Sequence, residues 1–422
     1  MMKGENMRKI INLFILTTLI LTAIPVMSSV IVIRNGKIMT PTQGVLSQAT
    51  LLIKDSKIQA VGPHIDIPDH AWIIDAQGCV LTPGLIDSHS HLGLGPSGGI
   101  TEDNEMSNPV TPQLRIIDSI HPEGVEPHRL SFQDAVAQGV TTIIARPGSG
   151  NVIGGQSAAL KLSGKTVDDM ILKFPCDMKM AMGRKSYYGN KGMMPVTKMG
   201  TAYLVRKTML EVQEYQNAWE RYREKAKNDP TAKPPKKNLK KEAMLKVLKQ
   251  EIPVHIHASP ADDIMTAVRL GDEFDFYRLS IGHGVEAYKI TEELAKRDVF
   301  VVVGPQMITF DDKGHLINLA DYLHKHGVEV NIMTDADVVQ QEFLRFQAAI
   351  AVKYGMDPLE ALKAITINPA RLIGKEDQIG SLEAGKDADL VIFDGDPFSL
   401  QTSVIKVFIN GKEVYTHEGK NE

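Results

Sequence analysis

Four histidines and one aspartate stand out because each lies at, or just beyond, the carboxyl end of an apolar segment that is typical of a β-strand. They are His89, His91, His257, His283 and Asp335. Neutral imidazoles bind divalent transition metals well, and a carboxylate completes a hydrolytic metal site. A metal of this kind lowers the pKa of bound water, and a nearby carboxylate can accept the proton. The five residues together predict a metal site for hydrolysis.

The prediction depends on the joint pattern, because each member alone has an ordinary structural explanation. A single histidine at a strand end, such as His283, is usually a satisfied polar residue, and Asp335 alone could cap a turn. The order of the five residues along successive strand ends is what favours a shared site. His255 alternates with His257 along one segment, so both side chains face the same side. His257 lies nearer the strand end and is therefore the preferred ligand.

The segments that must position these residues alternate between strands and helices from residue 83 to residue 377. We expect strands over residues 141–145, 178–182, 253–257, 279–283, 299–303 and 328–333. Helices are expected between them, for example over residues 291–297 and 316–326. Alternation over roughly 300 residues predicts an α/β fold, a (β/α)8 TIM barrel, in which the carboxyl ends of the strands converge on one mouth.

Residues 201–252 interrupt this alternation and are expected to form a helical insertion. Residues 201–223 and 242–250 have helical patterns, and the intervening stretch 227–241 is rich in lysine and proline. We interpret the insertion as two exposed helices joined by a solvated loop. The alternative for the basic stretch is a lid that binds an anion.

The two chain ends have a different pattern, with short β-branched segments separated by turn signals. Residues 30–82 and 378–422 are expected to form one composite β-sandwich domain, since chain termini often lie close together. The dipeptides Asn35-Gly36 and Asn410-Gly411 predict hairpin turns within it.

A basic and apolar segment precedes the first of these strands. Lys3, Arg8 and Lys9 come before an apolar run over residues 10–27. This order is typical of an export signal, so residues 1–29 are expected to be cleaved and the mature protein to be periplasmic or secreted. The alternatives are an uncleaved membrane anchor, which the length of the run barely allows, and a buried helix.

Bulk composition limits the partners. The chain of 422 residues has a formal net charge of −4, which gives no reason to expect a nucleic-acid partner. We expect a small-molecule substrate, a membrane contact only through an uncleaved N-terminus, and possible homo-oligomerisation. The 2 cysteines, Cys79 and Cys176, are expected to be buried free thiols rather than a disulfide.

Two stretches of sequence resemble a known family. Residues 82–91 read TPGLIDSHSH and resemble the signature that opens the barrel in the amidohydrolase superfamily. Residues 368–371 read NPAR, residues 379–391 read IGSLEAGKDADLV, and both resemble that superfamily's return to its β-sandwich. The resemblance extends from about residue 30 to the C-terminus, and the subgroup it resembles most is the imidazolonepropionase-like and prolidase-like one.

The resemblance implies a role for each residue of the pattern. His89 and His91 match the metal ligands of the first barrel strand, and His257 and His283 match those of the fifth and sixth. Asp335 matches the aspartate of the eighth strand, which binds metal and shuttles the proton from the attacking water to the leaving nitrogen. His283 and Asp335 are thus the expected catalytic residues. The implied cofactor is one or two divalent ions, zinc before iron or manganese.

The sequence also departs from the subgroup. Relatives tend to carry an acid where Arg184 and Lys185 stand, and histidines where Ser259 and Ala336 stand. Lys179 is either a carboxylated bridge between two metals or a lysine with a buried stem. Two functions follow: hydrolysis of a C–N bond in a cyclic amide, amidine or dipeptide-like substrate, or a weakened homologue that binds a ligand or partner.

Overall fold

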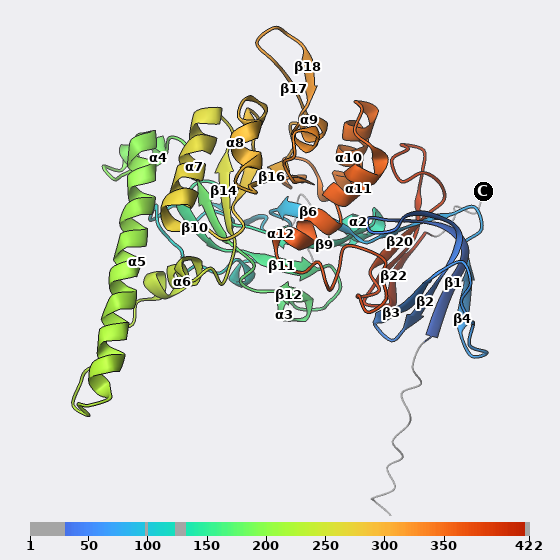
Figure 1. Cartoon of the computed structure of the whole chain (residues 1–422), viewed down its shortest axis with the longest axis horizontal. Coiled ribbons are helices and arrows are strands. Elements are labelled where there is room, and N and C mark those ends of the chain that lie inside the picture. The colour runs from blue at the N-terminus through green and yellow to red at the C-terminus, as the bar shows by residue number, and fades with distance from the viewer. Residues whose placement is uncertain (1–29, 98–99, 123–131, 418–422) are drawn as a thin grey trace, which may run out of the picture.

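The structure is a computed structural model that describes residues 30–97, 100–122 and 132–417. The expected export signal over residues 1–29 lies outside these ranges. Within them, no helix combines the length and the apolar content that crossing a membrane requires. The described chain is a mixed α/β protein with two regions that lie side by side (Figure 1).

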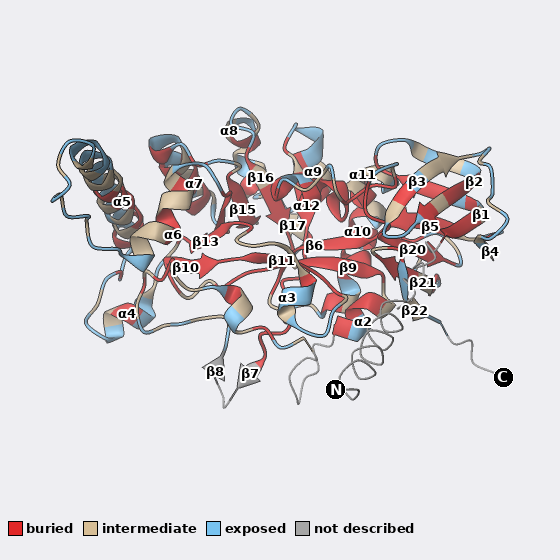
Figure 2. Cartoon of the chain, turned by 90° about the horizontal axis from the view of Figure 1, so that it is seen from below, coloured by how far each residue is buried: buried red, intermediate tan, exposed pale blue. Residues whose placement is uncertain are grey.

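Seven parallel strands form the interior of the larger region. Five of them pair in succession: β13 (Met178–Ala181), β14 (Val254–Ala258), β15 (Ser280–His283), β16 (Phe300–Val303) and β19 (Val330–Ile332). The other two, β6 (Leu85–Ser90) and β9 (Val140–Ala145), pair with each other. Nearly all their residues are buried, which explains why the strands read as apolar runs rather than as alternating patterns (Figure 2). The expected strands at these positions are confirmed.

Antiparallel strands connect the two groups of parallel strands. The strands β10 (Ile153–Gln156) and β11 (Ala158–Lys161) follow each other directly in the chain. The first pairs antiparallel with β13 and the second antiparallel with β9, and β11 also pairs with β12 (Ile171–Lys173). On the opposite side, a parallel bridge joins Ser90 to Ala336. The two sheets of this region therefore approach each other at both edges.

Helices cover the outside of these strands (Figure 1). They are α2 (Phe132–Ala137), α3 (Val167–Met170), α4 (Ser186–Asn190), α5 (Lys198–Ala226), α6 (Leu239–Leu248), α7 (Ala261–Phe274), α8 (Thr291–Ala295), α9 (Leu319–Lys325), α10 (Leu344–Lys353), α11 (Pro358–Ala364) and α12 (Ile367–Leu372). Two short hairpins complete the region: β7 (Pro96–Ser97) with β8 (Ile100–Thr101), and β17 (Ile308–Phe310) with β18 (Leu316–Asn318). The helix expected over residues 316–326 is partly wrong, because its first three residues form β18.

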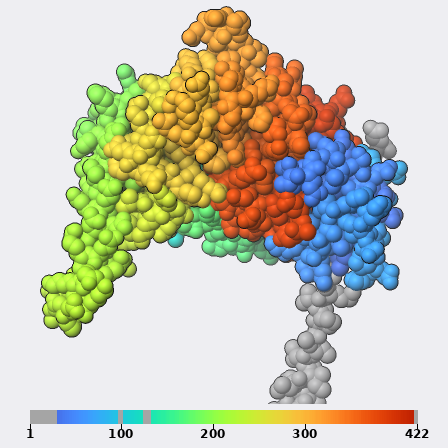
Figure 3. Space-filling view, viewed as in Figure 1, coloured from blue at the N-terminus to red at the C-terminus, as the bar shows by residue number. Residues whose placement is uncertain are grey.

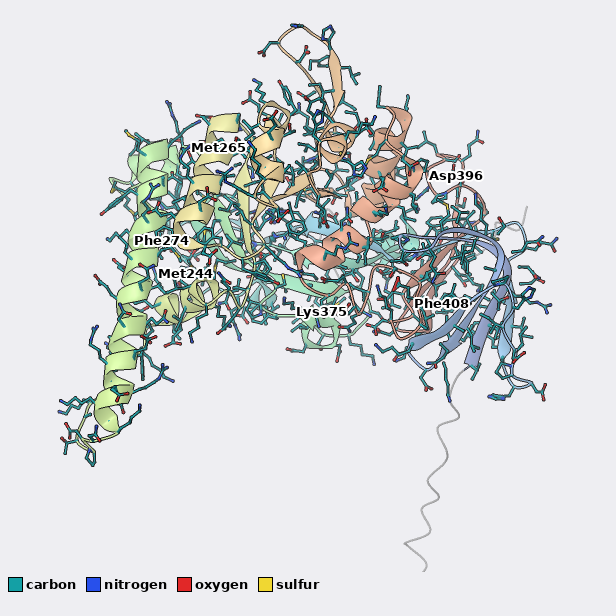
Figure 4. The ribbon with its side chains drawn as sticks, in the orientation of Figure 1. Met244, Met265, Phe274, Lys375, Asp396 and Phe408 are labelled. Atoms are coloured by element: carbon teal, nitrogen blue, oxygen red, sulfur yellow. The ribbon has the colours of Figure 1, made fainter. Side chains whose placement is uncertain are left out.

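Two helices, α5 and α6, occupy most of residues 201–252, and the lysines between them are exposed. The longer helix, α5, begins after Thr197, whose side chain accepts a hydrogen bond from the Gly200 amide. Val205, Met209 and Val212 recur at helical spacing and are buried on one face. That face packs beside the core that includes Met244 of α6 and Phe274 of α7 (Figure 4). The far end of α5 projects beyond the body of the protein (Figure 3).

Both chain ends contribute to one eight-stranded sheet in the smaller region. Its order is β22-β21-β20-β5-β1-β2-β3, and β4 pairs with β1. The bounds are β1 (Val30–Thr40), β2 (Gly44–Lys54), β3 (Lys57–Gly62), β4 (Trp72–Asp75), β5 (Val80–Pro83), β20 (Leu390–Phe393), β21 (Val404–Ile409) and β22 (Lys412–Thr416). The two ends meet where β5 and β20 pair antiparallel. The expectation that the ends pair with each other is confirmed.

One of the two expected hairpin turns in this sheet is wrong. Asn410 and Gly411 connect β21 to β22 with φ values of 52° and 70°, as a tight hairpin requires. Asn35 also has a positive φ of 64°, but β1 continues through it as an irregularity in its pairing with β2. The Asn35 side chain donates to Asp75. Strand pairing on both sides of Asn35 overrides the local turn signal.

A buried cluster of charges joins the two regions. Lys161, at the end of β11, places its Nζ 2.7 Å from Asp387 Oδ2 and 2.8 Å from Asp389 Oδ2. Lys57 Nζ lies 2.6 Å from Asp387 Oδ1. This lysine approaches from the solvent side, because its side chain is 42% exposed. The amide of Asn410 donates to Asp389 Oδ1 at 2.7 Å. Lys161 is thus the buried cation that neutralises two carboxylates at this junction.

Both cysteines are free thiols, and they should differ in reactivity. Cys176 is buried and Cys79 only partly so. Burial raises the pKa of the Cys176 thiol well above its ordinary value, so its reactive thiolate form is suppressed. In native protein we expect Ellman's reagent to leave Cys176 unmodified while Cys79 reacts slowly, whereas both react in denaturant. Rapid titration of two thiols in the native state would contradict this assignment.

Candidate metal centre

Three of the expected residues form a compact group of possible metal ligands. His89 is in β6, His91 is the first residue after that strand, and Asp335 lies beyond the end of β19. Their candidate ligand atoms all lie within 4.8 Å of one another. Asp335 Oδ1 is 3.4 Å from Nε2 of both histidines. Because the strands that carry them are parallel, residues far apart in sequence meet at the carboxyl ends of those strands.

His283 lies at the edge of this group. Its Nε2 is 3.8 Å from Asp335 Oδ2, and its ring centroid is 6.4 Å from that of His89. Both His283 and Asp335 have positive φ angles, 69° and 54° respectively. A backbone conformation that is unfavourable for these residue types is common where function requires a side chain in a particular place. Both residues with this uncommon backbone conformation thus lie beside the candidate ligands.

His257 lies beside His283, next to the group formed by His89, His91 and Asp335. The centroids of the two rings are 4.3 Å apart. Burial lowers the pKa of His257 to about 2, so the ring is neutral and retains a lone pair. Its Nδ1 is buried and has no hydrogen-bond partner among the described residues. A buried ring nitrogen without a hydrogen-bond partner is energetically costly. A bound metal ion would remove this cost, so the nitrogen is a candidate metal ligand.

The state of Asp335 suits a base. Burial acts to raise its pKa, but the neighbouring His91 ring and the charges of His283 and Lys179 outweigh burial, so the pKa lies below the ordinary value. The group is therefore a carboxylate at neutral pH. His91 is oriented by the carbonyl oxygen of Arg146, which accepts a hydrogen bond from His91 Nδ1 at 2.9 Å. A carbonyl oxygen only accepts, so the lone pair of His91 lies on Nε2, facing Asp335.

A buried carboxyl group ties the elements of this site together. Asp87 accepts hydrogen bonds from the Thr334 hydroxyl at 2.6 Å, from Gln341 Nε2 at 2.5 Å and from the His89 amide at 3.0 Å. These bonds connect β6 to the residue that precedes Asp335. Burial raises the pKa of Asp87 to about 6 despite these donors and the Thr334 amide, which also donates to it. Asp87 is a structural clamp that the sequence analysis did not single out, although it lies within the same SHSH-containing signature.

Lys179 is fully buried in the site. Its Nζ lies 3.4 Å from His89 Nε2, and burial lowers its pKa to about 7. Its amine therefore lies beside a candidate metal ligand, as a lysine that bridges two metals would require. Lys185 is turned elsewhere, because its amine donates to the Ser149 carbonyl at 2.6 Å. Ala336 is fully buried and its carbonyl accepts the His91 amide at 2.7 Å, so its backbone rather than its side chain supports the site.

Comparison with known proteins identifies the family. Residues 80–414 match the model of the Amidohydrolase family. A crystal structure of an amidohydrolase from Thermotoga maritima is 36% identical over 92% of this chain and 100% of its own, with a TM-score of 0.83. The amidohydrolase tasK of Hapsidospora irregularis is 27% identical over 84% of this chain. An imidazolonepropionase of Fusobacterium nucleatum is 26% identical over 82% of this chain and 84% of its own length.

The lengths of these relatives differ. The chain spans only 38% of the length of tasK, but most of the imidazolonepropionase and all of the Thermotoga protein. The family match includes both His89 and Asp335, together with strands β5, β20 and β21 of the smaller region. The resemblance to the superfamily and to its imidazolonepropionase-like members is thus confirmed. This chain belongs to the amidohydrolase family.

Proposed function

We propose that this chain is a metal-dependent hydrolase of C–N bonds in small molecules. The observation that carries the proposal is the group formed by His89, His91 and Asp335, in a chain whose family members are amidohydrolases. His283 and His257 extend the same group. We further infer that the parallel strands and β10–β11 close into a TIM barrel and that the chain ends form a sandwich beside it. The direct succession of β10 and β11 at one edge and the bridge between Ser90 and Ala336 at the other support the closed arrangement.

The donor set fits a divalent metal. Neutral imidazole nitrogens combined with one carboxylate are the ligands that zinc prefers, and iron and manganese also accept them. The unpartnered Nδ1 of His257 fits the same interpretation. His89, His91 and Asp335 would hold the ion, with His257 and His283 as further ligands for one or two ions. When bound, the metal supplies Lewis acidity and lowers the pKa of water.

The chain's own residues supply the proton transfers. Asp335, as a carboxylate, accepts a proton from the attacking water at Oδ and returns it to the leaving nitrogen. His283, with Nε2 3.8 Å from Asp335 Oδ2, stands where it can stabilise charge on the carbonyl oxygen of the substrate. His91, fixed by the Arg146 carbonyl, keeps its Nε2 directed at Asp335. The similarity to an imidazolonepropionase over most of both chains supports a cyclic amide as the first substrate class to test.

A screen of metal-free and metal-restored protein tests this proposal. The substrates would be cyclic amides such as hydantoins and dihydropyrimidine amides, with dipeptides as the second class. We expect hydrolysis of at least one class that disappears after chelation and returns with added zinc. Hydrolysis that survives complete removal of metal would contradict the proposal.

The second candidate is a weakened homologue that binds a ligand without turning it over. The buried amine of Lys179 beside His89 favours it, because a charged amine there would repel a cation. The two candidates differ in one outcome. A binding protein retains its ligand but shows no turnover with any substrate of the screen, with or without added metal.

A further inference from the structure

A second histidine stands directly behind His89. His255 is fully buried in β14, and its Nε2 lies 3.0 Å from His89 Nδ1. The other nitrogen of the ring, Nδ1, lies 2.8 Å from the hydroxyl oxygen of Ser280. Ser280 is the residue of β15 that pairs with His255 in the sheet, and its hydroxyl reaches the carbonyl of Val254 at 3.5 Å. Three side chains thus form a continuous chain of hydrogen bonds that ends on His89.

This chain of hydrogen bonds can run in only two directions. Both rings are fully buried. A buried imidazole is stable in its neutral form, which carries one N–H. Because His89 Nδ1 and His255 Nε2 are 3.0 Å apart, one of these nitrogens donates and the other accepts. Either every donor points away from the metal site, or every donor points toward it.

The acceptor at the far end favours one direction. The Val254 carbonyl can only accept, and at 3.5 Å it lies at the outer limit of a hydrogen bond from the Ser280 hydroxyl. A hydroxyl that donates to this carbonyl accepts from His255 Nδ1 at 2.8 Å. The lone pair of His255 is then on Nε2 and accepts from His89 Nδ1. His89 is left with its lone pair on Nε2, the nitrogen that is 3.4 Å from Asp335 Oδ1. Two groups lie 3.4 Å from the same nitrogen, the donor Lys179 Nζ and the acceptor Asp335 Oδ1, so the direction depends on Ser280.

Gly282 makes room for the arrangement. A Cβ atom at this position would lie 2.7 Å from His255 Nε2 and 3.1 Å from its Cε1, closer than such atoms approach. Gly282 has no positive φ, so its backbone conformation does not require glycine. The small residue is needed because the ring of His255 lies against it.

We propose that His255, held by Ser280, is a positioning residue that fixes His89 in the tautomer whose Nε2 can bind a metal. The inference rests on the proposed function, because it specifies how one ligand of that metal site is prepared. In the opposite tautomer, His89 Nε2 carries a proton directed at Asp335 and cannot bind metal. A histidine that binds metal through one nitrogen usually donates a hydrogen bond from the other, which fixes the tautomer. Loss of that acceptor typically weakens metal affinity about 10–100-fold.

Zinc affinity of folded, metal-free protein provides the first test, by competition with a chromogenic chelator. We expect His255→Leu to weaken zinc binding about 10–100-fold, because His89 Nδ1 then loses its acceptor. His255→Gln places a side-chain oxygen near the position of Nε2 and should restore much of the affinity. Ser280→Ala should fall between the two. His324→Leu, at an exposed histidine, is the matched control and should bind zinc as the wild type does.

The tautomer itself provides the second test, which needs neither metal nor activity. Long-range ¹H–¹⁵N spectra of ring-labelled, metal-free protein report which nitrogen of each histidine carries the proton, and the His89 signal is assigned by its absence in His89→Gln. We expect an unprotonated Nε2 in the wild type and a loss of this single state in Ser280→Ala and Gly282→Ala. These two variants also serve if His255→Leu does not fold.

A protonated Nε2 on His89 in the wild type would overturn the inference. So would wild-type zinc affinity in His255→Leu, or an equal loss in His255→Leu and His255→Gln, which would indicate a packing role only. Failure of the wild type to bind zinc would instead contradict the proposed function. The spectra would then still decide whether the His255 relay exists.

Discussion

Asp335→Asn is expected to lower kcat by about 10²–10⁴-fold at saturating metal, the usual contribution of a positioned general base. The amide keeps an oxygen that can bind metal and fills the same space, but it cannot accept a proton. Asp335 Oδ1 lies 3.4 Å from Nε2 of both His89 and His91, so this carboxylate is at the centre of the proposed site. Loss of the proton acceptor should therefore affect kcat more than KM.

Asp337→Asn is the matched control for this substitution. Asp337 lies two residues further along the same loop and is exposed. The same change of carboxylate to amide there should leave kcat and KM unaltered. Steady-state kinetics with the substrate found by the screen would measure both variants. A wild-type kcat in Asp335→Asn would remove Asp335 from the chemistry.

Lys161→Met is expected to have the largest effect on stability. Its Nζ is within 2.8 Å of carboxylate oxygens of both Asp387 and Asp389, and all three side chains are at most 7% exposed. Methionine has similar length but no charge, so the variant leaves two buried carboxylates without this cation. Breaking a buried ion pair by removal of one partner typically costs about 3–5 kcal/mol. The free energy of unfolding in urea should fall by that amount.

Lys57→Met separates this effect from the general loss of a lysine. Lys57 contacts the same Asp387 at 2.6 Å, but its side chain is 42% exposed. Solvent screens such a pair, so this variant should cost less than about 1 kcal/mol. Equal losses in the two variants would show that burial at Lys161 is not the cause. Because the cluster joins the two regions of the chain, Lys161→Met should also broaden the transition.

Much of the site could be predicted from the sequence because its residues follow apolar strands. His89, His91 and Asp335 lie at the carboxyl ends of β6 and β19, and parallel strands bring such ends together. The same reasoning placed His283 near Asp335. The assignment of His257 as a ligand stays a prediction, supported by its unpartnered Nδ1.

The parts that could not be predicted depend on contacts distant in sequence. His255 and His257 face the same side of one strand, and only Ser280, on the next strand, explains what His255 does. The antiparallel pairing of β10 with β13 likewise has no local signal, because Gly154 and Gly155 are more typical of a loop than of a strand. Arg146 follows β9 directly, at a strand end where a side chain could meet substrate. The structure buries its guanidinium against Asp177, at 2.6 Å, so the residue cannot contact substrate.

The metal content of the purified protein tests the central claim most directly. Elemental analysis of protein loaded with zinc and then freed of excess ion should find at least about one equivalent in the wild type. The double variant His89→Ala, His91→Ala should retain less than about a tenth of that amount while it keeps the wild-type circular dichroism spectrum. Equal metal content in the two proteins, or less than about a tenth of an equivalent in the wild type, would contradict the metal site proposed for this amidohydrolase.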